Sequence, residues 1–202
     1  MAIINGTIFN DDGSFFLFPA LNGTNGDDSI FGFQGNDILN GFDGNDLLDG
    51  GADNDQLNGG IGFDTYFGGD GNDVLTDSNT NFTNDDQGDF LDGGAGADTM
   101  NGGDGSDTYI VDNVGDLITG DIDDSQGGTA DLVNASVTYA LVAAMENLTL
   151  TGAAAINGTG NAKNNIINGN GANNTLSGLV GNDTLNGGNG NDTYLGGDGN
   201  DT

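Results

Sequence analysis

The sequence predicts an all-β fold in which short strands stack on one another as a parallel β-solenoid. Three observations indicate it: a nine-residue period, a glycine-rich turn in each period, and one large apolar residue at a fixed place. From Gly23 to Thr76 the pattern G-x-x-G-x-D-x-U-x, in which U is large and apolar, runs six times without a gap. A short fixed period indicates one small structural unit stacked on itself.

The order of segments follows from where this period starts, breaks and resumes. Residues 1–22 are rich in phenylalanine and predict a cap or lead-in, because stacked repeats need a terminal element over the open end of their core. The segments after it are a first repeat block at 23–76, a polar break at 77–83, a second block at 84–110, a spacer at 111–159 and a third block at 160–202. We expect the spacer to continue the stack with longer strands, since its apolar residues alternate or cluster as in strands. The last copy stops at Thr202 inside its own motif, which indicates a longer parent protein.

Each repeat predicts a tight turn of about six residues followed by a strand of about three. Glycines at the first, second and fourth positions permit left-handed backbone angles and leave their carbonyl oxygens uncovered. Two repeats, eighteen residues, would complete one loop of a flattened coil. The eighth-position residues would then line a narrow interior from both sides: Ile30, Leu39, Leu48, Leu57, Tyr66, Leu75, Leu91, Met100, Tyr109, Ile167, Leu176, Leu185 and Tyr194.

The composition limits the possible partners. The formal net charge is −31, from 32 acidic residues against a single base, Lys163. Such a chain has no basic patch for nucleic acid, and no apolar run approaches the roughly 20 residues of a membrane-spanning helix. It has 40 glycines, no cysteine and no histidine, which excludes disulfides and thiol- or imidazole-ligated metals.

The sixth-position aspartates are the candidate metal ligands. They are Asp28, Asp37, Asp46, Asp55, Asp64, Asp73, Asp89, Asp98, Asp107, Asp183, Asp192 and Asp201. In the predicted coil, every second aspartate lies about 4.8 Å from the next, one strand spacing away. Carboxylates that close repel unless a cation lies between them. Carboxylate and carbonyl oxygens suit Ca²⁺, which takes roughly six to eight oxygen ligands, better than Mg²⁺, which demands tighter geometry.

Some repeats depart from the pattern, so we expect the sites to differ. Asp53, Lys163 and Ala172 replace the fourth-position glycine, while Asn165 and Asn174 replace the sixth-position aspartate and should weaken their sites. The best predicted pairs are Asp28/Asp46, Asp37/Asp55, Asp46/Asp64, Asp55/Asp73 and Asp183/Asp201, followed by Asp89/Asp107. We expect Asp98 to lack a full partner.

The nonapeptide resembles the RTX (repeats-in-toxin) repeat over roughly 23–110 and 160–202, and the spacer resembles segments between RTX blocks of bacterial proteins. The RTX consensus is itself a standard example of a calcium-binding β-helix repeat. The resemblance implies a right-handed parallel β-roll with several Ca²⁺ ions between successive turns. It also implies a secreted or cell-surface protein, usually exported by a type I system that reads an uncleaved C-terminal signal; the N-terminus has no basic region typical of a cleaved signal.

Three function classes follow. We expect a calcium-binding structural module of a secreted bacterial protein, which folds on calcium binding after export. Alternatively, the chain is the repeat region of a secreted protease, lipase or polysaccharide-modifying enzyme whose catalytic domain is absent. The chain itself is predicted not to be an enzyme, because without histidine it offers no H-E-x-x-H motif and no Ser-His pair. The third class is adhesion through a flat face, with Phe33, Phe42 and Phe63 as apolar spots. Exposed coil ends also predict end-to-end self-association.

Overall fold

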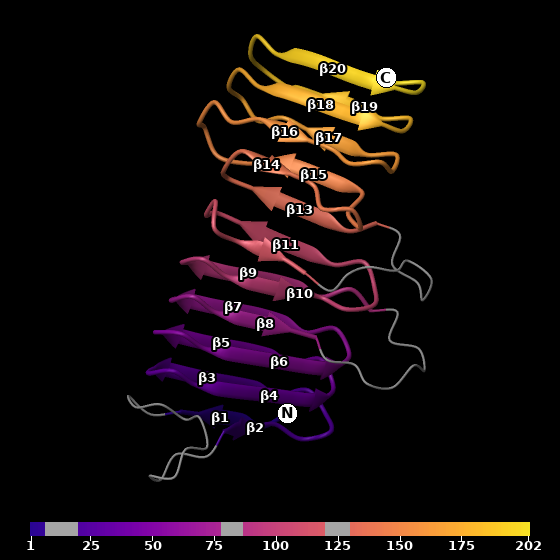
Figure 1. Ribbon diagram of the computed structural model, residues 1–202. Coiled ribbons are helices and arrows are strands. Elements are labelled where there is room, and N and C mark those ends of the chain that lie inside the picture. The colour runs from indigo at the N-terminus through magenta and orange to yellow at the C-terminus, as the bar shows by residue number, and fades with distance from the viewer. Residues whose placement is uncertain (7–19, 78–86, 120–129) are drawn as a thin grey trace.

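The computed structural model describes residues 1–6, 20–77, 87–119 and 130–202, and these form one stack of parallel strands (Figure 1). The chain winds upward from the N-terminus at one end of the stack to the C-terminus at the other. Strands adjacent in a sheet are two strands apart in sequence, so each winding contributes one strand to each face. The prediction of an all-β parallel solenoid is confirmed.

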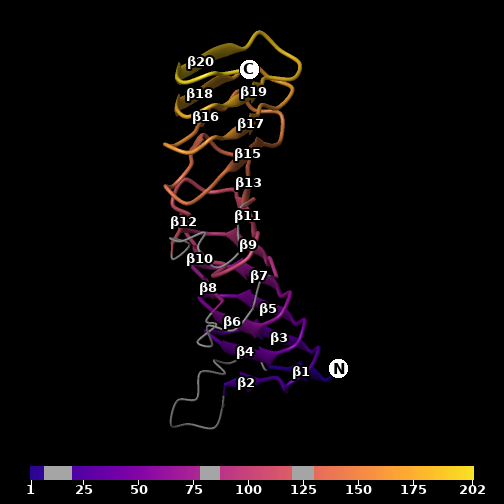
Figure 2. The same ribbon diagram turned by 90° about the vertical axis from the view of Figure 1, so that its right-hand side faces the viewer.

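One face of the solenoid is a continuous sheet, and the other is divided into two sheets (Figure 2). The ten-stranded sheet consists of β1 (Ile3–Asn5), β3 (Ser29–Gln34), β5 (Leu47–Ala52), β7 (Thr65–Asp70), β9 (Phe90–Ala95), β11 (Thr108–Val111), β13 (Leu132–Ala135), β15 (Asn147–Leu150), β17 (Ile166–Asn168) and β19 (Thr184–Asn186). The opposite six-stranded sheet consists of β2 (Leu21–Asn22), β4 (Ile38–Asp43), β6 (Gln56–Ile61), β8 (Val74–Thr76), β10 (Thr99–Asn101) and β12 (Leu117–Ile118). The four-stranded sheet consists of β14 (Tyr139–Ala140), β16 (Gly158–Thr159), β18 (Thr175–Val180) and β20 (Thr193–Asp198).

The strand register shows how much chain each winding uses. Through the first repeats Ser29 pairs with Leu47, and Leu47 pairs with Thr65, an offset of two nonapeptides each time. The next pairing, Thr65 with Phe90, spans a longer stretch of chain than the two nonapeptides of the earlier windings. The winding is therefore kept even where the nine-residue period is broken.

The core is a single column of apolar side chains between the two faces. From Ile30 to Leu176, every predicted interior residue is almost fully buried, because strand geometry points alternate side chains inward. Tyr194 differs and is 52% exposed, since it lies in the last winding and no further turn covers it.

The windings between β13 and β17 have a wider core than the glycine-rich ones. Here the interior includes not one but several apolar residues per turn: Val133, Ala135, Leu141, Ala144, Met145, Leu148, Leu150 and Ile156. The expectation of longer strands in the spacer is wrong for its described residues, because β13 and β15 pair through four residues whereas β3 and β5 pair through five. The stack passes through the predicted spacer without a gap in the ten-stranded sheet.

Parts of the sequence-based prediction lie outside the described residues. In the predicted N-terminal cap, only the short strands β1 and β2 are described, and they start the two facing sheets. Of the predicted polar break, Asp77 is described and 78–83 are not. No helix in the described part of the chain has the length and apolarity needed to span a membrane.

Candidate metal-binding turns

The turns between strands require a backbone that few side chains tolerate. The fourth-position glycines Gly44 and Gly62 have φ of 128° and 136°, a region open to glycine. Asp53 takes the same place with φ 78°, in the left-handed region that aspartate visits more readily than most residues. Phe33 and Phe42 adopt φ of 78° and 82° at the second position, and their rings are about half exposed. The strict turn geometry places the sixth-position residue at the same point of every winding.

The sixth-position aspartates form a ladder along each edge of the solenoid. Along one edge, the backbone N–H of Asp28 donates to Oδ1 of Asp46 at 2.7 Å, and that of Asp46 donates to Oδ1 of Asp64 at 2.7 Å. Along the other edge, the backbone N–H of Asp37 donates to Oδ1 of Asp55 at 2.8 Å, and that of Asp55 donates to Oδ1 of Asp73 at 2.8 Å. These four pairs are the ones that the nine-residue spacing predicts to be neighbours.

The ladders cross the broken period. The N–H of Asp64 donates to Asp89 Oδ1 at 2.8 Å, and Asp73 donates to Asp98 Oδ1 at 2.8 Å. Asp89 in turn donates to Asp107 at 2.7 Å. The expectation that Asp98 lacks a full partner is wrong, because Asp98 also donates to Oδ1 of Asp116 at 3.1 Å.

Three acidic residues of the spacer continue the ladders, and sequence reasoning missed them. They are Asp116, Asp131 and Glu146. Asp116 accepts a hydrogen bond from the N–H of Asp98 at 3.1 Å, and Asp131 accepts one from the N–H of Asp107 at 2.8 Å. Glu146 accepts one from the N–H of Asp131 at 3.0 Å. The spacer has no glycine pattern at these points. The feature that could have identified them is an acidic residue two positions before a buried apolar residue, as in Asp131-Leu132-Val133.

The third block repeats the arrangement more weakly. Asp183 is buried and its N–H donates to Asp201 Oδ1 at 3.0 Å. Asp192 accepts from the N–H of Asn174 at 2.9 Å. Both Asp192 and Asp201 are half-buried, because they lie in the last windings.

Each laddered carboxylate has a second oxygen that faces the interior of its turn. This atom, Oδ2, is buried and accepts no hydrogen bond from the described part of the chain in Asp46, Asp55, Asp73, Asp98 and Asp183. A buried charged oxygen without a donor is strongly unfavourable. These five atoms indicate that the turns are built for a positively charged group that the polypeptide does not supply there.

Asp28, at the start of the first ladder, differs from the others. Its Oδ1 accepts from the N–H of Ala2 at 2.5 Å, and its Oδ2 accepts from the N–H and hydroxyl of Thr24 at 2.6 and 2.8 Å. The hydrogen bond from Ala2 is the main reason that the pKa of Asp28 is lowered. Both oxygens already have donors, so Asp28 needs a cation less than Asp46 does.

First-position glycines keep the space beside each carboxylate open. A Cβ on Gly41 would overlap Asp46 Oδ2 and lie 2.7 Å from the carbonyl oxygen of Gly59, one winding on. A Cβ on Gly178 would similarly overlap Asp183 Oδ2 and lie 2.6 Å from the carbonyl oxygen of Gly196. Carboxylate and carbonyl oxygens from successive windings therefore border the same small space.

Burial makes these carboxylates hard to ionise without a counter-charge. Desolvation raises the pKa of Asp46 and of Asp98 to about 6, although the N–H donors act against it. It raises the pKa of Asp55 to about 8, with Asp73 and Asp37 as repelling neighbours. The pKa of Asp89 rises to about 10, again mainly through desolvation. At neutral pH the raised pKa favours a proton on Asp55 and Asp89. A bound cation would offset the cost of desolvation for all four carboxylates.

One site has an additional carboxylate. Asp77 stands where the first-position glycine would be, and carboxylate oxygens of Asp64, Asp77 and Asp89 all lie within 4.8 Å of one another. All three residues are buried. Among the described residues it is the one group of three carboxylates so close together, and it lies immediately before the break in the period.

The asparagines at the sixth position act differently from the aspartates. Asn165 and Asn174 lie on the two ladders, but their Nδ2 groups donate to backbone carbonyls of the preceding winding. Their turns therefore present donors, where the aspartate turns present acceptors.

The donor set of the aspartate turns fits Ca²⁺. It contains only carboxylate and backbone carbonyl oxygens from two windings, which are the hard ligands that Ca²⁺ prefers, and no nitrogen or sulfur ligand. Bound there, Ca²⁺ would neutralise the carboxylates of adjacent windings.

The comparisons agree with this chemistry. The family model of the RTX calcium-binding nonapeptide repeat matches residues 20–46, 40–75, 85–109, 158–184 and 168–202, which together make up more than half of the chain. No catalytic family is indicated. A search of curated proteins found no match to this sequence.

Proposed function

The chain belongs to the RTX calcium-binding nonapeptide repeat family, and from this premise we propose that it is a calcium-binding structural module of a secreted protein, which folds on binding Ca²⁺ after export. The module itself performs no catalysis in this proposal. The observation that carries it is the set of buried Oδ2 atoms that accept no hydrogen bond within the described part of the chain, those of Asp46, Asp55, Asp73, Asp98 and Asp183.

The charge of the chain explains why folding would depend on the cation. The aspartates of each ladder are brought one strand spacing apart, and the only basic side chain, Lys163, lies in a different turn. Without an added cation, forming the ladders places unneutralised carboxylates in a desolvated row, which opposes folding. Binding restricted to the folded state stabilises it by about 2.7 kcal/mol per site at a ligand concentration 100 times the dissociation constant.

The same dependence would suit export. In a compartment poor in calcium, repulsion among the carboxylates keeps the aspartate-rich repeat blocks unfolded, which favours passage through a secretion channel. Extracellular modules bind Ca²⁺ with dissociation constants of roughly 10⁻⁴–10⁻³ M, so filling occurs outside the cell. RTX repeats are typical of secreted bacterial proteins, which supports this location.

The test is a far-UV circular dichroism titration of the purified chain, started in chelator, with Ca²⁺ and Mg²⁺ in parallel. We expect a coil-to-β transition at about 10⁻⁴–10⁻³ M Ca²⁺ and none at equal Mg²⁺. A matched pair of variants locates the effect: D46N removes a buried carboxylate with an unbonded Oδ2, whereas D43N removes an exposed one in the same repeat. D46N should shift the midpoint to higher Ca²⁺ and D43N should not. Identical titrations for both variants, or a signal independent of Ca²⁺, would overturn the proposal.

A further inference from the structure

Two pairs of neighbouring turns in the centre of the solenoid are bridged by side-chain donors of the protein itself. From this we infer that residues 132–174, here termed the middle section, form a self-closed part of the solenoid that excludes Ca²⁺ and folds without it. The inference rests on the proposed function only in taking Ca²⁺ as the cation of the other turns.

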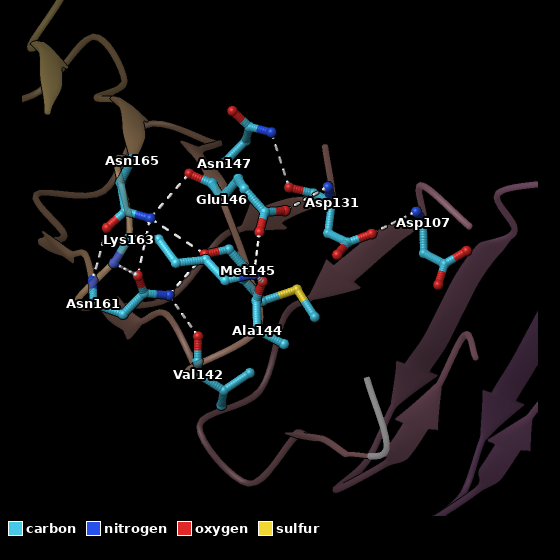
Figure 3. Close-up of polar contacts among 10 residues, drawn as sticks. All are labelled: Asp107, Asp131, Val142, Ala144, Met145, Glu146, Asn147, Asn161, Lys163 and Asn165. Carbon is cyan, nitrogen blue, oxygen red and sulfur yellow. Dashed lines mark hydrogen bonds and ion pairs between the residues drawn. The ribbon is translucent and has the colours of Figure 1, made fainter. Parts of the chain in front are cut away.

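The first of these contacts between windings is made by the single basic residue of the chain. Lys163 stands at a fourth position that is usually glycine, and its Nζ donates to the carbonyl oxygen of Ala144 and to Glu146 Oε1, the latter at 2.5 Å (Figure 3). Both acceptors belong to the winding below. An ammonium group thus stands between two windings where the aspartate turns have only oxygen atoms.

Two amides complete this bridge. Asn161 Nδ2 donates to the carbonyl oxygens of Val142 and Met145, each at 2.7 Å. Asn165 Nδ2 donates to the carbonyl oxygens of Met145 and Glu146, each at 3.2 Å. Figure 3 shows all three donor side chains directed at the turn that precedes β15. The carbonyl oxygens that would be ligands in this turn are already satisfied by protein hydrogens.

The opposite edge has the same arrangement without the lysine. Asn170 Nδ2 donates to the carbonyl oxygens of Thr151 and Ala154 at 3.1 and 2.9 Å, and Asn174 Nδ2 donates to that of Ile156 at 2.6 Å. In each turn the second-position asparagine also accepts from the sixth, at 3.2 Å for Asn161 and 3.1 Å for Asn170. Asparagine at both the second and the sixth position of one repeat, as in Asn161/Asn165 and Asn170/Asn174, is therefore the sequence signal of a self-closed turn.

A divalent cation has no place in these turns. It would meet amide and ammonium hydrogens, the positive ends of their bonds, and would have to displace Lys163 from Glu146. Hard cations require oxygen ligands with available lone pairs, which the aspartate turns provide and these turns do not. The two kinds of turn thus have opposite preferences, and they also differ in backbone, since Phe42 and Gly44 have positive φ and Asn161 and Lys163 do not.

The middle section also has the apolar contacts to form on its own. Its windings bury several apolar residues each, including Val133, Leu141, Met145 and Leu148, where a glycine-rich winding buries one from each repeat. Burial of apolar area is the main favourable contribution to folding. Because Glu146 accepts from Asp131, and Asp131 from Asp107, the section also presents a formed ladder end to the calcium-binding turns before it.

The test is hydrogen–deuterium exchange of the full chain, followed by mass spectrometry, in chelator and in Ca²⁺. In chelator, we expect amides of β15 and β17 to exchange at least about 10-fold more slowly than those of β5 and β6, since local stability sets protection. In Ca²⁺ both regions should be protected. Rapid exchange of β15 and β17 in chelator would overturn the inference. Exchange of β5 and β6 that ignores Ca²⁺ would instead overturn the proposed function.

A pair of variants with equal net charge tests the bridge. K163M removes the ammonium, and N189D adds one negative charge at an exposed turn position, so both become more negative by one. Hydrogen bonds to charged groups predict about 10- to 100-fold faster exchange of β15 and β17 for K163M in chelator, and no change for N189D. Protection of β5 and β6 in Ca²⁺ shows that K163M still folds. Equal exchange of β15 and β17 in the two variants would contradict a bridging role for Lys163.

Discussion

The turns of the first repeat block and those of the middle section present opposite kinds of groups to the adjacent winding, hydrogen-bond acceptors in the first and donors in the second. In the block, buried carboxylates such as Asp46 and Asp55 face backbone carbonyls, and Oδ2 of each has no hydrogen-bond donor among the described residues. In the middle section, Asn161, Lys163 and Asn165 direct hydrogens at the carbonyls of the adjacent winding. The side chains at the second, fourth and sixth positions therefore set the need for a cation. They also change the backbone, since the left-handed φ of Phe42 and Gly44 is not found at Asn161 and Lys163.

Removal of calcium should give the largest difference in thermal stability between the first block and the middle section. Each filled site contributes about 2.7 kcal/mol at 100 times its dissociation constant, which corresponds to a rise in Tm of about 5–11 °C for a chain of this size. Chelation should therefore lower the Tm by several such steps and melt the first block before the middle section. Differential scanning calorimetry would show the transition of the first block in Ca²⁺ and only that of the middle section in chelator. A single transition at the same temperature in both conditions would contradict the account.

Acidification should rescue the metal-free first block. An aspartate in an unfolded chain has a pKa of about 3.9, whereas folding raises the pKa of Asp46 to about 6 and that of Asp55 to about 8. The folded state therefore holds these protons more tightly, and its stability is lost as the pH rises through 6 and 8. In chelator, urea unfolding should give a stability higher by several kcal/mol at pH 4.5 than at pH 8.5, of order 1 kcal/mol per unit shift for each group. In Ca²⁺ the trend should reverse, because protons compete with the metal.

Replacing one glycine by alanine in each region should reduce the stability of the first block and leave that of the middle section nearly unchanged. G41A places a Cβ on Asp46 Oδ2 and 2.7 Å from the carbonyl oxygen of Gly59, so it should cost about 3 kcal/mol in Ca²⁺. G171A lies in the middle section and meets no atom within 4 Å. It should change the stability by less than about 1 kcal/mol. Urea unfolding in Ca²⁺ measures both, and equal losses would show that the space beside Asp46 has no special role.

The substitution D55N should reverse its effect with calcium. In chelator it removes a buried carboxylate that repels Asp37 and Asp73, so it should stabilise the first block by about 1–2 kcal/mol. In Ca²⁺ it removes a ligand charge and should destabilise the block by about the same amount. A loss of stability in both conditions would indicate that Asp55 serves only the hydrogen bond from Asp37.

The smallest expected change is at Asp53, whose φ of 78° suits glycine better. D53G restores the repeat pattern but also removes the carboxylate that accepts from the N–H of Gly35 at 3.2 Å. We expect a gain of up to about 0.5 kcal/mol from relief of the backbone angle, reduced by the greater freedom of glycine in the unfolded chain. Thermal unfolding in Ca²⁺ would measure it, and a clear loss would show that the surface hydrogen bond matters more.

The sequence predicts the solenoid and the first-block ladders well, because the nine-residue period alone fixes which residues share an edge. Asp37, Asp55 and Asp73 lie where their spacing requires. It could not predict that Asp73 pairs with Asp98, since their separation is 25 residues and the constant separation of 18 does not hold there.

The middle section was predictable in outline only. Asp131 and Glu146 join a ladder without any glycine turn to mark them, so the spacing offered no register. Asn165 was interpreted as a weakened ligand, but an amide has a donor as well as an acceptor. Which of the two faces the turn depends on the adjacent winding, here on the carbonyls of Met145 and Glu146. Local sequence cannot supply that contact.

The most direct measurement is a crystal structure of the full chain grown in Ca²⁺, with the ions located by their anomalous scattering. The account predicts ions beside Asp46, Asp55 and Asp73, each between successive windings, and none between 141–146 and 160–165. Aspartate turns without ions, or an ion among Asn161, Lys163 and Asn165, would contradict it.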